Sequence, residues 1–521
     1  MSTSERVKSP GQLDTGIEKK TNRRRWTGFA LGLILAIVVF LAMPADLDHS
    51  PKITAATAVL MGVWWMTEAI PIPATALLPV LIFPLAAMVD SNGDSIGFDD
   101  VGASYGNHII FLFMGGFLIA LAMQRWNLHR RIALHIVRLM GGKSQPMIGG
   151  FMIATGFISM WVSNTATAVM MLPLGTSVLV LVSEQMSDGK ETAEGPEKGV
   201  ASKVHDVIRT NFGTALMLGI AYSASLGSLS TIIGTPPNTL LVGYLASNHD
   251  IHIGFGQWML VGLPIAIVFT FLCWFLLTHV LFKPEISEIP GGRELVANEL
   301  RKLGPMATGE KLVLTVFALA AVSWIFIPVI FEDPPIDDAG IAIAAGLVLF
   351  LFPAKANRGV KLLDWDSAVE LPWGVLLLFG GGLALSAQFT ESGLSKWIGT
   401  QAEAVGVLPV VLIVAIITTL IIFLTELTSN TATAATFLPV VGGVALGVGL
   451  DPLLLTIPTA LAASCAFMLP VATPPNAVAF GSGYVTIGSM IKGGIWLNLI
   501  GIVLVTATTM TLAVWVFGIS Y

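Results

Sequence analysis

Charge is scarce in this chain. Asp, Glu, Lys and Arg make up 12% of its 521 residues, whereas a soluble protein carries about 25%. Hydrophobic residues make up 54%, the mean hydropathy is +0.80, and several apolar stretches reach the ~20 residues that a membrane helix needs. The net charge of −6 is too weak to suggest a nucleic-acid partner. The composition therefore excludes a large soluble domain and predicts a multi-pass protein of the lipid bilayer.

Cysteine and histidine are also rare. Cys273 and Cys465 both lie in apolar runs, which is typical of small core residues rather than of a disulfide or a metal pair. The chain has eight histidines, none near the serines discussed below, and no His-Glu-x-x-His motif. Intramembrane hydrolysis needs a nucleophile with a base, or a metal cluster. We therefore expect neither an enzyme nor an organic cofactor.

Polar strings that occur twice are the most informative feature present. Ser-Asn-Thr-Ala-Thr-Ala occurs at 163–168 and again, 266 residues later, at 429–434. Thr-Pro-Pro-Asn follows each copy, at 235–238 and 473–476, and Phe113 to Gly116 resembles Leu378 to Gly381 at nearly the same offset. Polar duplicates inside apolar sequence predict an internally duplicated transporter whose site forms where the two halves meet.

The apolar runs predict an all-α fold with eleven membrane crossings and two re-entrant hairpins. The expected crossings are roughly 27–44, 53–69, 74–89, 107–124, 210–248, 256–282, 309–331, 338–353, 370–390, 452–489 and 494–518. The hairpins are expected at about 146–183 and 407–449, because each run is about twice a bilayer length and has a polar string near its middle. The alternative is two ordinary spanning helices with a polar kink. Five crossings separate the two strings, so the repeat should be inverted.

Charge along the chain predicts domain boundaries and orientation. We expect a cytoplasmic segment at 1–26, a first repeat at 27–282, a cytoplasmic linker at 283–308 and a second repeat at 309–521. Lys and Arg are concentrated in the N-terminal segment, around 125–143, and near 184–209, 283–311 and 354–362, whereas 90–100 and 332–338 are acidic. By the positive-inside rule, the N-terminus is cytoplasmic and Tyr521 is outside a cell (inner) membrane.

The repeated strings suit helix ends at mid-membrane. Ser, Asn and Thr cap the start of a helix, and Thr235 and Thr473 are placed to cap the helices that begin with Pro236 and Pro474. Gly227, Gly234 and Pro470 indicate unwound segments before those prolines. A helix start binds an anion through free N–H groups, and the carbonyls at a helix end suit Na⁺. The alternative is that these small polar residues serve only helix packing.

A buried dianion must be neutralised, and the strings contain almost no basic residues. Co-bound Na⁺ would neutralise it, although protons or exchange of one anion for another would also serve.

Glu68, His108 and Glu426 lie at or near apolar runs. Glu426 either tunes a cation site at the second tip, or faces the loop mouth or pairs with a group of the transporter's scaffold. A channel is the other class of membrane protein to consider, but a channel would need a continuous polar pore, whereas this chain has two separate polar strings.

These strings resemble those of the divalent anion/sodium symporter family. Trp64 to Pro71 resembles the family's early signature, and Ala463 to Asn476 its late one. The resemblance implies an elevator-type transporter and a homodimer. It implies a first Na⁺ site at Ser159, Ser163, Asn164 and the Gly234 carbonyl, and a second at Thr425, Thr428, Asn430 and the Ala472 carbonyl. It also implies substrate contacts at Asn164, Thr165, Asn430, Thr431, Thr473 and Pro474.

The expected function is therefore sodium-coupled uptake of a C4 dicarboxylate such as succinate, malate or fumarate. Two neutral, short tips suit two carboxylates held between opposing helix ends. A sodium-independent dicarboxylate exchanger is the alternative, as are citrate or sulfate as substrates. The hydroxyls at Ser159 and Thr425 favour symport.

Overall fold

The computed structural model describes residues 19–90, 92–188, 210–289, 291–331, 334–402 and 406–520. In these ranges the regular elements are helices, with three isolated β-bridges. The expectations for residues 1–18, for 189–209 in the basic linker, for 332–333 and for Tyr521 lie outside the described residues.

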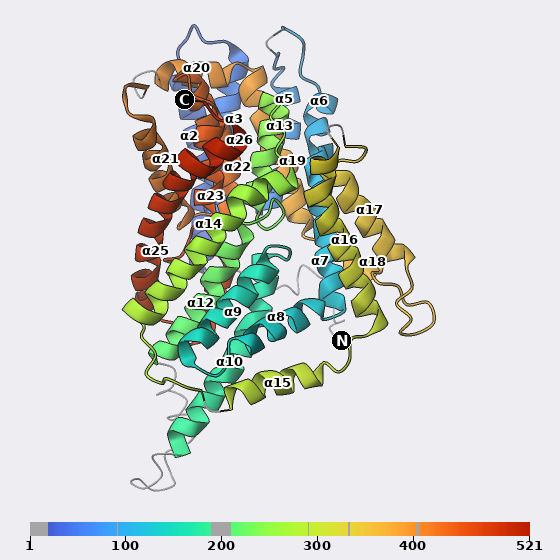
Figure 1. The fold of residues 1–521 in the computed structure, drawn as a ribbon. Helices are drawn as coiled ribbons and strands as arrows, with labels where there is room; N and C mark the ends of the chain where they lie inside the picture. Colours follow the sequence, from blue (N-terminus) through green and yellow to red (C-terminus); the bar gives the residue numbers. More distant parts are fainter. Residues whose placement is uncertain are drawn as a thin grey trace, which may run out of the picture.

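The helices run in the predicted order (Figure 1). Before the second repeat they are α2 (Lys19–Ala42), α3 (His49–Thr67), α4 (Ile72–Thr75), α5 (Leu78–Leu85), α6 (Phe98–Ala103), η1 (Ser104–Gly106), α7 (His108–Arg125), α8 (Leu128–Leu139), α9 (Ser144–Ser159), α10 (Asn164–Asp188), α12 (Asn211–Ser228), α13 (Pro236–His249), α14 (Phe255–Phe275), η2 (Leu276–Leu281) and α15 (Gly292–Lys302). The second repeat contains α16 (Thr308–Ile330), α17 (Asp338–Leu351), α18 (Trp365–Ala368), α19 (Trp373–Glu391), α20 (Leu394–Ala402), α21 (Val410–Thr425), α22 (Asn430–Gly447), α23 (Leu453–Ala463), α24 (Pro474–Gly481), α25 (Ile487–Thr508), η4 (Thr509–Ala513) and α26 (Val514–Phe517).

Eight helical stretches in the described part of the chain are long and apolar enough to cross a membrane, and shorter apolar helices lie between them. The number of eleven crossings stays a prediction. One predicted boundary is wrong: α25 begins at Ile487, whereas the sequence analysis ends one crossing at 489 and begins the next at 494. Thr486 and Ser489 form a capping box there, and Gly483 turns the chain with a φ of +81°.

Both predicted hairpins are pairs of helices that meet at a short non-helical tip. Residues 160–163 join α9 to α10, and residues 426–429 join α21 to α22. The two arms contact each other in each pair. Each polar string therefore starts at the tip and continues into the second arm, as the sequence predicts.

Both Thr-Pro-Pro-Asn strings follow a break between two short helices. Residues 229–235 separate α12 from α13, and residues 464–473 separate α23 from α24. Helix α13 packs against α23, and the hydroxyl oxygens of Thr235 and Ser464 are 3.3 Å apart. The two breaks, one from each repeat, therefore lie side by side.

The third repeated marker lies where α7 meets α19. The rings of Phe113 and Phe379, which are 266 residues apart in sequence, pack edge to face with centroids 4.8 Å apart. This geometry is favourable for aromatic pairs. Equivalent positions of the two repeats thus touch near the centre of the molecule.

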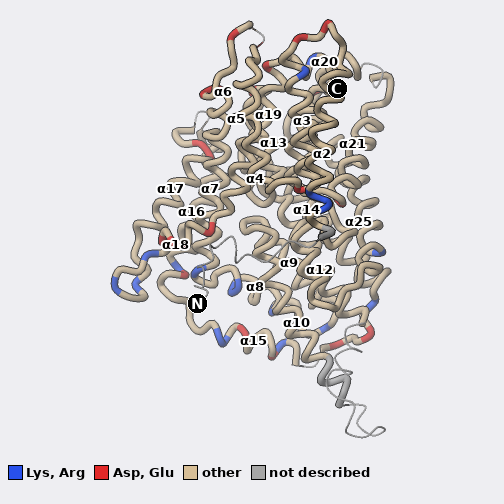
Figure 2. The backbone as a smooth tube through the Cα atoms, turned by 180° about the vertical axis from the view of Figure 1, so that it is seen from behind, with Lys and Arg blue, Asp and Glu red and all other residues tan. Residues whose placement is uncertain are grey.

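Basic side chains of α7 and α8 bind segments that follow the first repeat. Arg130 pairs with Glu299 of α15 at 2.7 Å, and Arg131 forms a bidentate pair with the buried Glu310 of α16. Arg125 pairs with Asp364 at 2.6 Å. Hydrogen bonds from Ser367, together with Arg125, lower the pKa of the Asp364 carboxyl. Figure 2 shows Lys and Arg gathered at the end of the molecule that carries α8, α15 and α18.

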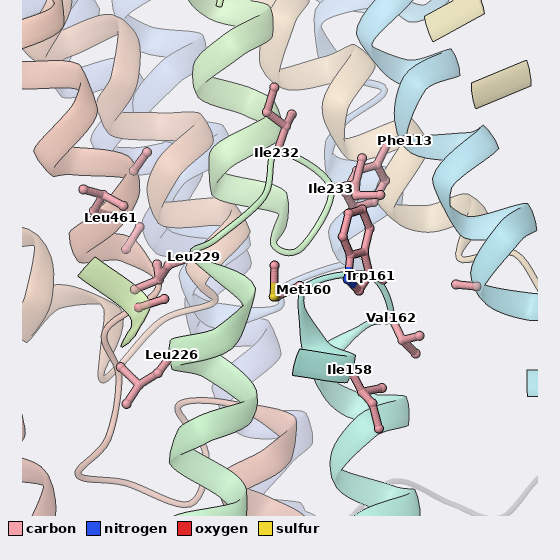
Figure 3. Packing of buried hydrophobic residues seen from close by; sticks show 14 of the residues in the cluster. Phe113, Ile158, Met160, Trp161, Val162, Leu226, Leu229, Ile232, Ile233 and Leu461 are labelled. Atoms are coloured by element: carbon pink, nitrogen blue, oxygen red, sulfur yellow. The ribbon is translucent and has the colours of Figure 1, made fainter. Parts of the chain in front are cut away.

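The first tip is embedded in apolar side chains. Figure 3 shows Met160 and Trp161 of the tip among Leu229, Ile232 and Ile233 of the neighbouring break. All five residues are buried, at 9% exposure or less. Unwound backbone at this depth is tolerated only where protein covers it or a cavity solvates it. The core therefore holds the tip in place on the side away from the cavity.

Helices α9 and α12 cross at two glycines. A Cβ atom on Gly227 would overlap the carbonyl oxygen and Cα of Gly156. Both atoms belong to backbone and cannot turn away.

We predict that Gly227→Ala destabilises the protein by about 1–3 kcal/mol, as overpacking of a tight interior does. Thermal unfolding of the detergent-purified protein measures this. Gly102→Ala in α6 is the control, because no atom lies within 4 Å of the added methyl position. Equal unfolding temperatures for Gly227→Ala and the unmodified protein would contradict the predicted close contact.

Candidate functional site

One cavity of about 870 Å³ collects residues from both tips and both breaks. It is lined by the six predicted substrate-binding residues, Asn164, Thr165, Asn430, Thr431, Thr473 and Pro474. Ser163, Gly234, Thr428 and Ala472 from the predicted sodium sites also line it. Segments more than 200 residues apart in the sequence thus meet around one space.

The cavity is open to solvent beside both the second tip and the second break. Leu427 is 68% exposed and Val471 is 82% exposed, although both are apolar. The opening lies at the start of α2, the end of α3 and the segment before α19, because Arg24, Glu68 and Glu370 line the cavity too. Arg24 donates to the Met66 carbonyl at 3.0 Å. Charged side chains therefore lie at this wall, whereas the tip residues that line the cavity are uncharged.

Beside the first tip, two acceptor oxygens surround a buried hydroxyl. Ser159 Oγ lies 2.9 Å from Asn164 Oδ1 and 2.6 Å from the Ala224 carbonyl oxygen. A hydroxyl has one hydrogen and can donate to only one of these acceptors at a time. Closely spaced oxygens of this kind are the ligands that a hard cation prefers.

The second tip repeats the arrangement atom for atom. Thr425 Oγ1 lies 2.8 Å from Asn430 Oδ1 and 2.9 Å from the Ala463 carbonyl oxygen. Ser159 and Thr425 are both fully buried and lie behind the cavity wall. They therefore contact the asparagine of each tip from the side away from the cavity.

Four helices begin at the cavity wall: α10, α13, α22 and α24 start at Asn164, Pro236, Asn430 and Pro474. A helix N-terminus presents unpaired N–H groups and a partial positive charge. Four of them around one space are an arrangement that suits an anion without a basic side chain at the tips. Arg24, from α2, adds a full positive charge at the opening.

The predicted helix caps are correct at two of four positions. Ser163 Oγ accepts from Ala166 N, and Thr473 Oγ1 accepts from Asn476 N, each at 3.3 Å. Ser429 and Thr235 make no capping hydrogen bond through their side chains. Thr235 instead faces Ser464 of the other repeat. A cap that requires only local geometry is predictable, but a competing partner from the other repeat is not.

Thr428 and His108 have more limited roles. The Thr428 hydroxyl lies 2.6 Å from Thr433 Oγ1 and also donates to the Leu424 carbonyl, so its backbone is the part free to bind an ion. His108 begins α7, but Asn107 caps this helix by accepting from Ile109 N at 3.0 Å. Asn107, and not His108, therefore caps this helix.

The final asparagine of each Thr-Pro-Pro-Asn string holds its break together, a role that the sequence analysis misses. Asn238 Nδ2 donates to the carbonyls of Leu229 and Thr231 at 3.2 and 2.9 Å. Asn476 Nδ2 donates to those of Ala466 and Leu469, both at 3.1 Å. The repetition of this asparagine in both strings could have indicated the role, because breaks in helices leave backbone carbonyls that need hydrogen-bond donors.

The fold and the cavity together define a class: a membrane transporter built from two repeats, with its site between paired tips. Residues 22–519 match the family model described as the sodium:sulfate symporter transmembrane region. The chain belongs to this family of divalent anion/sodium symporters, as the sequence motifs predict. It is a multi-pass membrane protein.

Curated relatives align over nearly the whole chain. The chain is 42% identical over 513 residues to the sodium-dependent dicarboxylate transporter SdcS of Staphylococcus saprophyticus, an alignment that covers 96% of this chain and 95% of the relative. It is 41% identical over 504 residues to SdcS of Staphylococcus aureus strain MRSA252, with coverage of 95% and 93%. These relatives are named as transporters, which agrees with the expectation that the chain is not an enzyme.

Two solved structures share the fold at low sequence identity. The YdaH transporter of Alcanivorax borkumensis has a TM-score of 0.53 at 14% identity, with coverage of 90% of this chain and 98% of that one. MtrF of Neisseria gonorrhoeae has a TM-score of 0.50 at 10% identity, with coverage of 94% and 98%. At this identity the likeness concerns the fold alone.

We predict that Asn238→Ala and Asn476→Ala each lower thermal stability by about 1–3 kcal/mol, because each leaves buried carbonyls without a donor. The same variants should lose most transport, since each break carries a helix start of the cavity. Asn298→Ala, at an exposed position of α15, is the control. Full activity and stability of both variants would contradict the role assigned to these asparagines.

Proposed function

We propose that this protein takes up C4 dicarboxylates such as succinate, malate or fumarate together with Na⁺. The observation that carries the proposal is the single cavity lined by both Ser-Asn-Thr tips and both Thr-Pro-Pro-Asn helix starts. Opposing helix N-termini offer N–H donors to the two carboxylates of one small anion. The 42% identity to a sodium-dependent dicarboxylate transporter supports the same substrate and coupling ion.

In this proposal Asn164, Thr165, Asn430, Thr431, Thr473 and Pro474 contact the substrate. Na⁺ binds beside each tip, first at Ser159, Ser163, Asn164 and the Gly234 carbonyl, and second at Thr425, Thr428, Asn430 and the Ala472 carbonyl. Support comes from the oxygens around Ser159 and Thr425 and from the absence of charged side chains among the tip residues that line the cavity. A dianion in such a site needs co-bound cations, because uncompensated charge is costly to bury.

We further propose that the segment 1–26 is cytoplasmic, that the C-terminus is outside a cell (inner) membrane, and that the repeats have inverted topology. Support comes from the basic residues gathered near α8, α15 and α18 (Figure 2). In this orientation the cavity faces the cytoplasm, since it opens where α2 begins. An elevator-type movement within a homodimer, with repeats at 27–282 and 309–521 joined by the linker 283–308, completes the proposal.

The first test is uptake of labelled succinate into proteoliposomes, with and without an inward Na⁺ gradient. We expect accumulation that saturates with succinate and requires Na⁺. Uptake that ignores Na⁺ but needs internal dicarboxylate would replace symport with exchange. If succinate is not taken up, uptake of citrate or sulfate would change the substrate, whereas failure with all three anions would refute the proposal.

We predict that Asn164→Ala and Asn430→Ala reduce succinate uptake at least about tenfold, equivalent to losing ~1.4 kcal/mol or more of binding. Thr428→Ala should retain most uptake, because its carbonyl remains. Detergent-solubilised variants should elute as folded protein on size-exclusion chromatography. Normal uptake by both asparagine variants would remove these residues from the site.

A further inference from the structure

Glu426 is a buried acid at the end of the first arm of the second hairpin. It directly follows Thr425, and it is 3% exposed. Among the described residues, no Lys, Arg or His forms an ion pair with it. It therefore neither faces the loop mouth nor pairs with a basic group.

The carboxylate is surrounded by N–H donors. Oε1 accepts from Phe467 N at 2.7 Å, Met468 N at 2.9 Å and Asn498 Nδ2 at 2.8 Å. Oε2 accepts from Met468 N at 3.0 Å and Leu469 N at 3.2 Å. Three consecutive backbone N–H groups form a concave anion site, and an ionised carboxylate only accepts. This environment matches the negatively charged form.

These hydrogen bonds join the second tip to the second break. Residues 467–469 lie in the break, three to five residues before Ala472, and Asn498 lies on α25. Thr425 donates to the carbonyl of Ala463, the last residue of α23 before the same break. Thr425 and Glu426 together therefore fix the path of the segment that carries a proposed sodium ligand and substrate contact.

In the first repeat, the equivalent connection between tip and break involves no charged side chain. The residue 266 positions before Glu426 is Met160, which is apolar. There too the break donates to the tip, but a break side chain donates to a tip carbonyl: Thr231 Oγ1 donates to the Met160 carbonyl at 2.5 Å. The two proposed sodium sites thus share their hydroxyl and asparagine but differ by one buried negative charge.

We propose that Glu426 is a positioning residue that makes the second sodium site the tighter of the two. Without touching Na⁺, it holds the break that carries the Ala472 carbonyl, and its charge favours a nearby cation because a buried charge is weakly screened. The proposal rests on the sodium coupling proposed above.

The experiment titrates Na⁺ at constant ionic strength, with choline as the replacement ion. It measures the unfolding temperature of the purified protein and the initial rate of succinate uptake. Glu426→Gln is compared with the unmodified protein and with Thr231→Val, which breaks the uncharged join. Glu294→Gln, an exposed acid of α15, controls for loss of a remote charge.

Glu426→Gln should raise the Na⁺ concentration for half-maximal stabilisation and half-maximal uptake about tenfold or more, while uptake recovers substantially at saturating Na⁺. Thr231→Val should lower the unfolding temperature with a smaller shift in Na⁺ dependence, and Glu294→Gln should match the unmodified protein. If Glu426→Gln does not fold, Glu426→Asp replaces it. This variant keeps the charge but shortens its reach, so it should also raise the Na⁺ requirement.

An unfolding temperature that falls with unchanged Na⁺ dependence would give Glu426 a purely structural role and overturn the proposal. An unchanged Na⁺ requirement in Glu426→Asp, where that variant is used, would do the same. If the unmodified protein transports without Na⁺, sodium coupling itself is wrong. The unmodified protein therefore separates failure of the proposed function from failure of this inference.

Discussion

Unpaired backbone at the helix interruptions is the constraint on which the rest of this structure depends. Two tips and two breaks leave N–H and C=O groups without helical partners, and such groups are costly to bury. Asn238 and Asn476 donate to carbonyls of the breaks, whereas Glu426 accepts from three consecutive N–H groups. The polar residues of this apolar chain are therefore concentrated where the helices stop.

The same constraint creates the chemistry of the site. A helix that starts at mid-depth directs N–H groups into the cavity, and one that ends there directs carbonyls into it. An anion and a cation can then bind close together without a lysine or arginine at the tips. A fixed basic residue there would hold the anion when the cation has left. A site built from helix ends instead makes the affinity for one ion depend on the presence of the other.

The sequence predicted the parts of this site that depend on local chain geometry. The duplicated strings located both tips and both breaks, because interrupted helices need small polar residues and prolines at particular positions. Partners from other elements were not predictable. Ser429 and Thr235 do not cap their helices, and the donors to Glu426 come from residues 467–469 and from Asn498, at least 41 positions away. Arg24 faces the cavity only because α2 starts beside it. Such contacts follow from helix packing, which a single sequence does not encode as a pattern.

The distribution of hydrogen bonds also bears on how the site moves. Each tip is joined to the break of its own repeat, through Met160 and Thr231 in the first and through Glu426 and residues 467–469 in the second. Thr235 and Ser464 then connect the two breaks to each other. Arg24, Glu68 and Glu370 meet these segments across the cavity. A rigid-body movement that preserved the hydrogen bonds between each tip and its break would carry both proposed ion sites and the proposed anion site together. The proposed elevator movement is of this kind, since it requires contacts to change at the opposite wall of the cavity while the site stays intact.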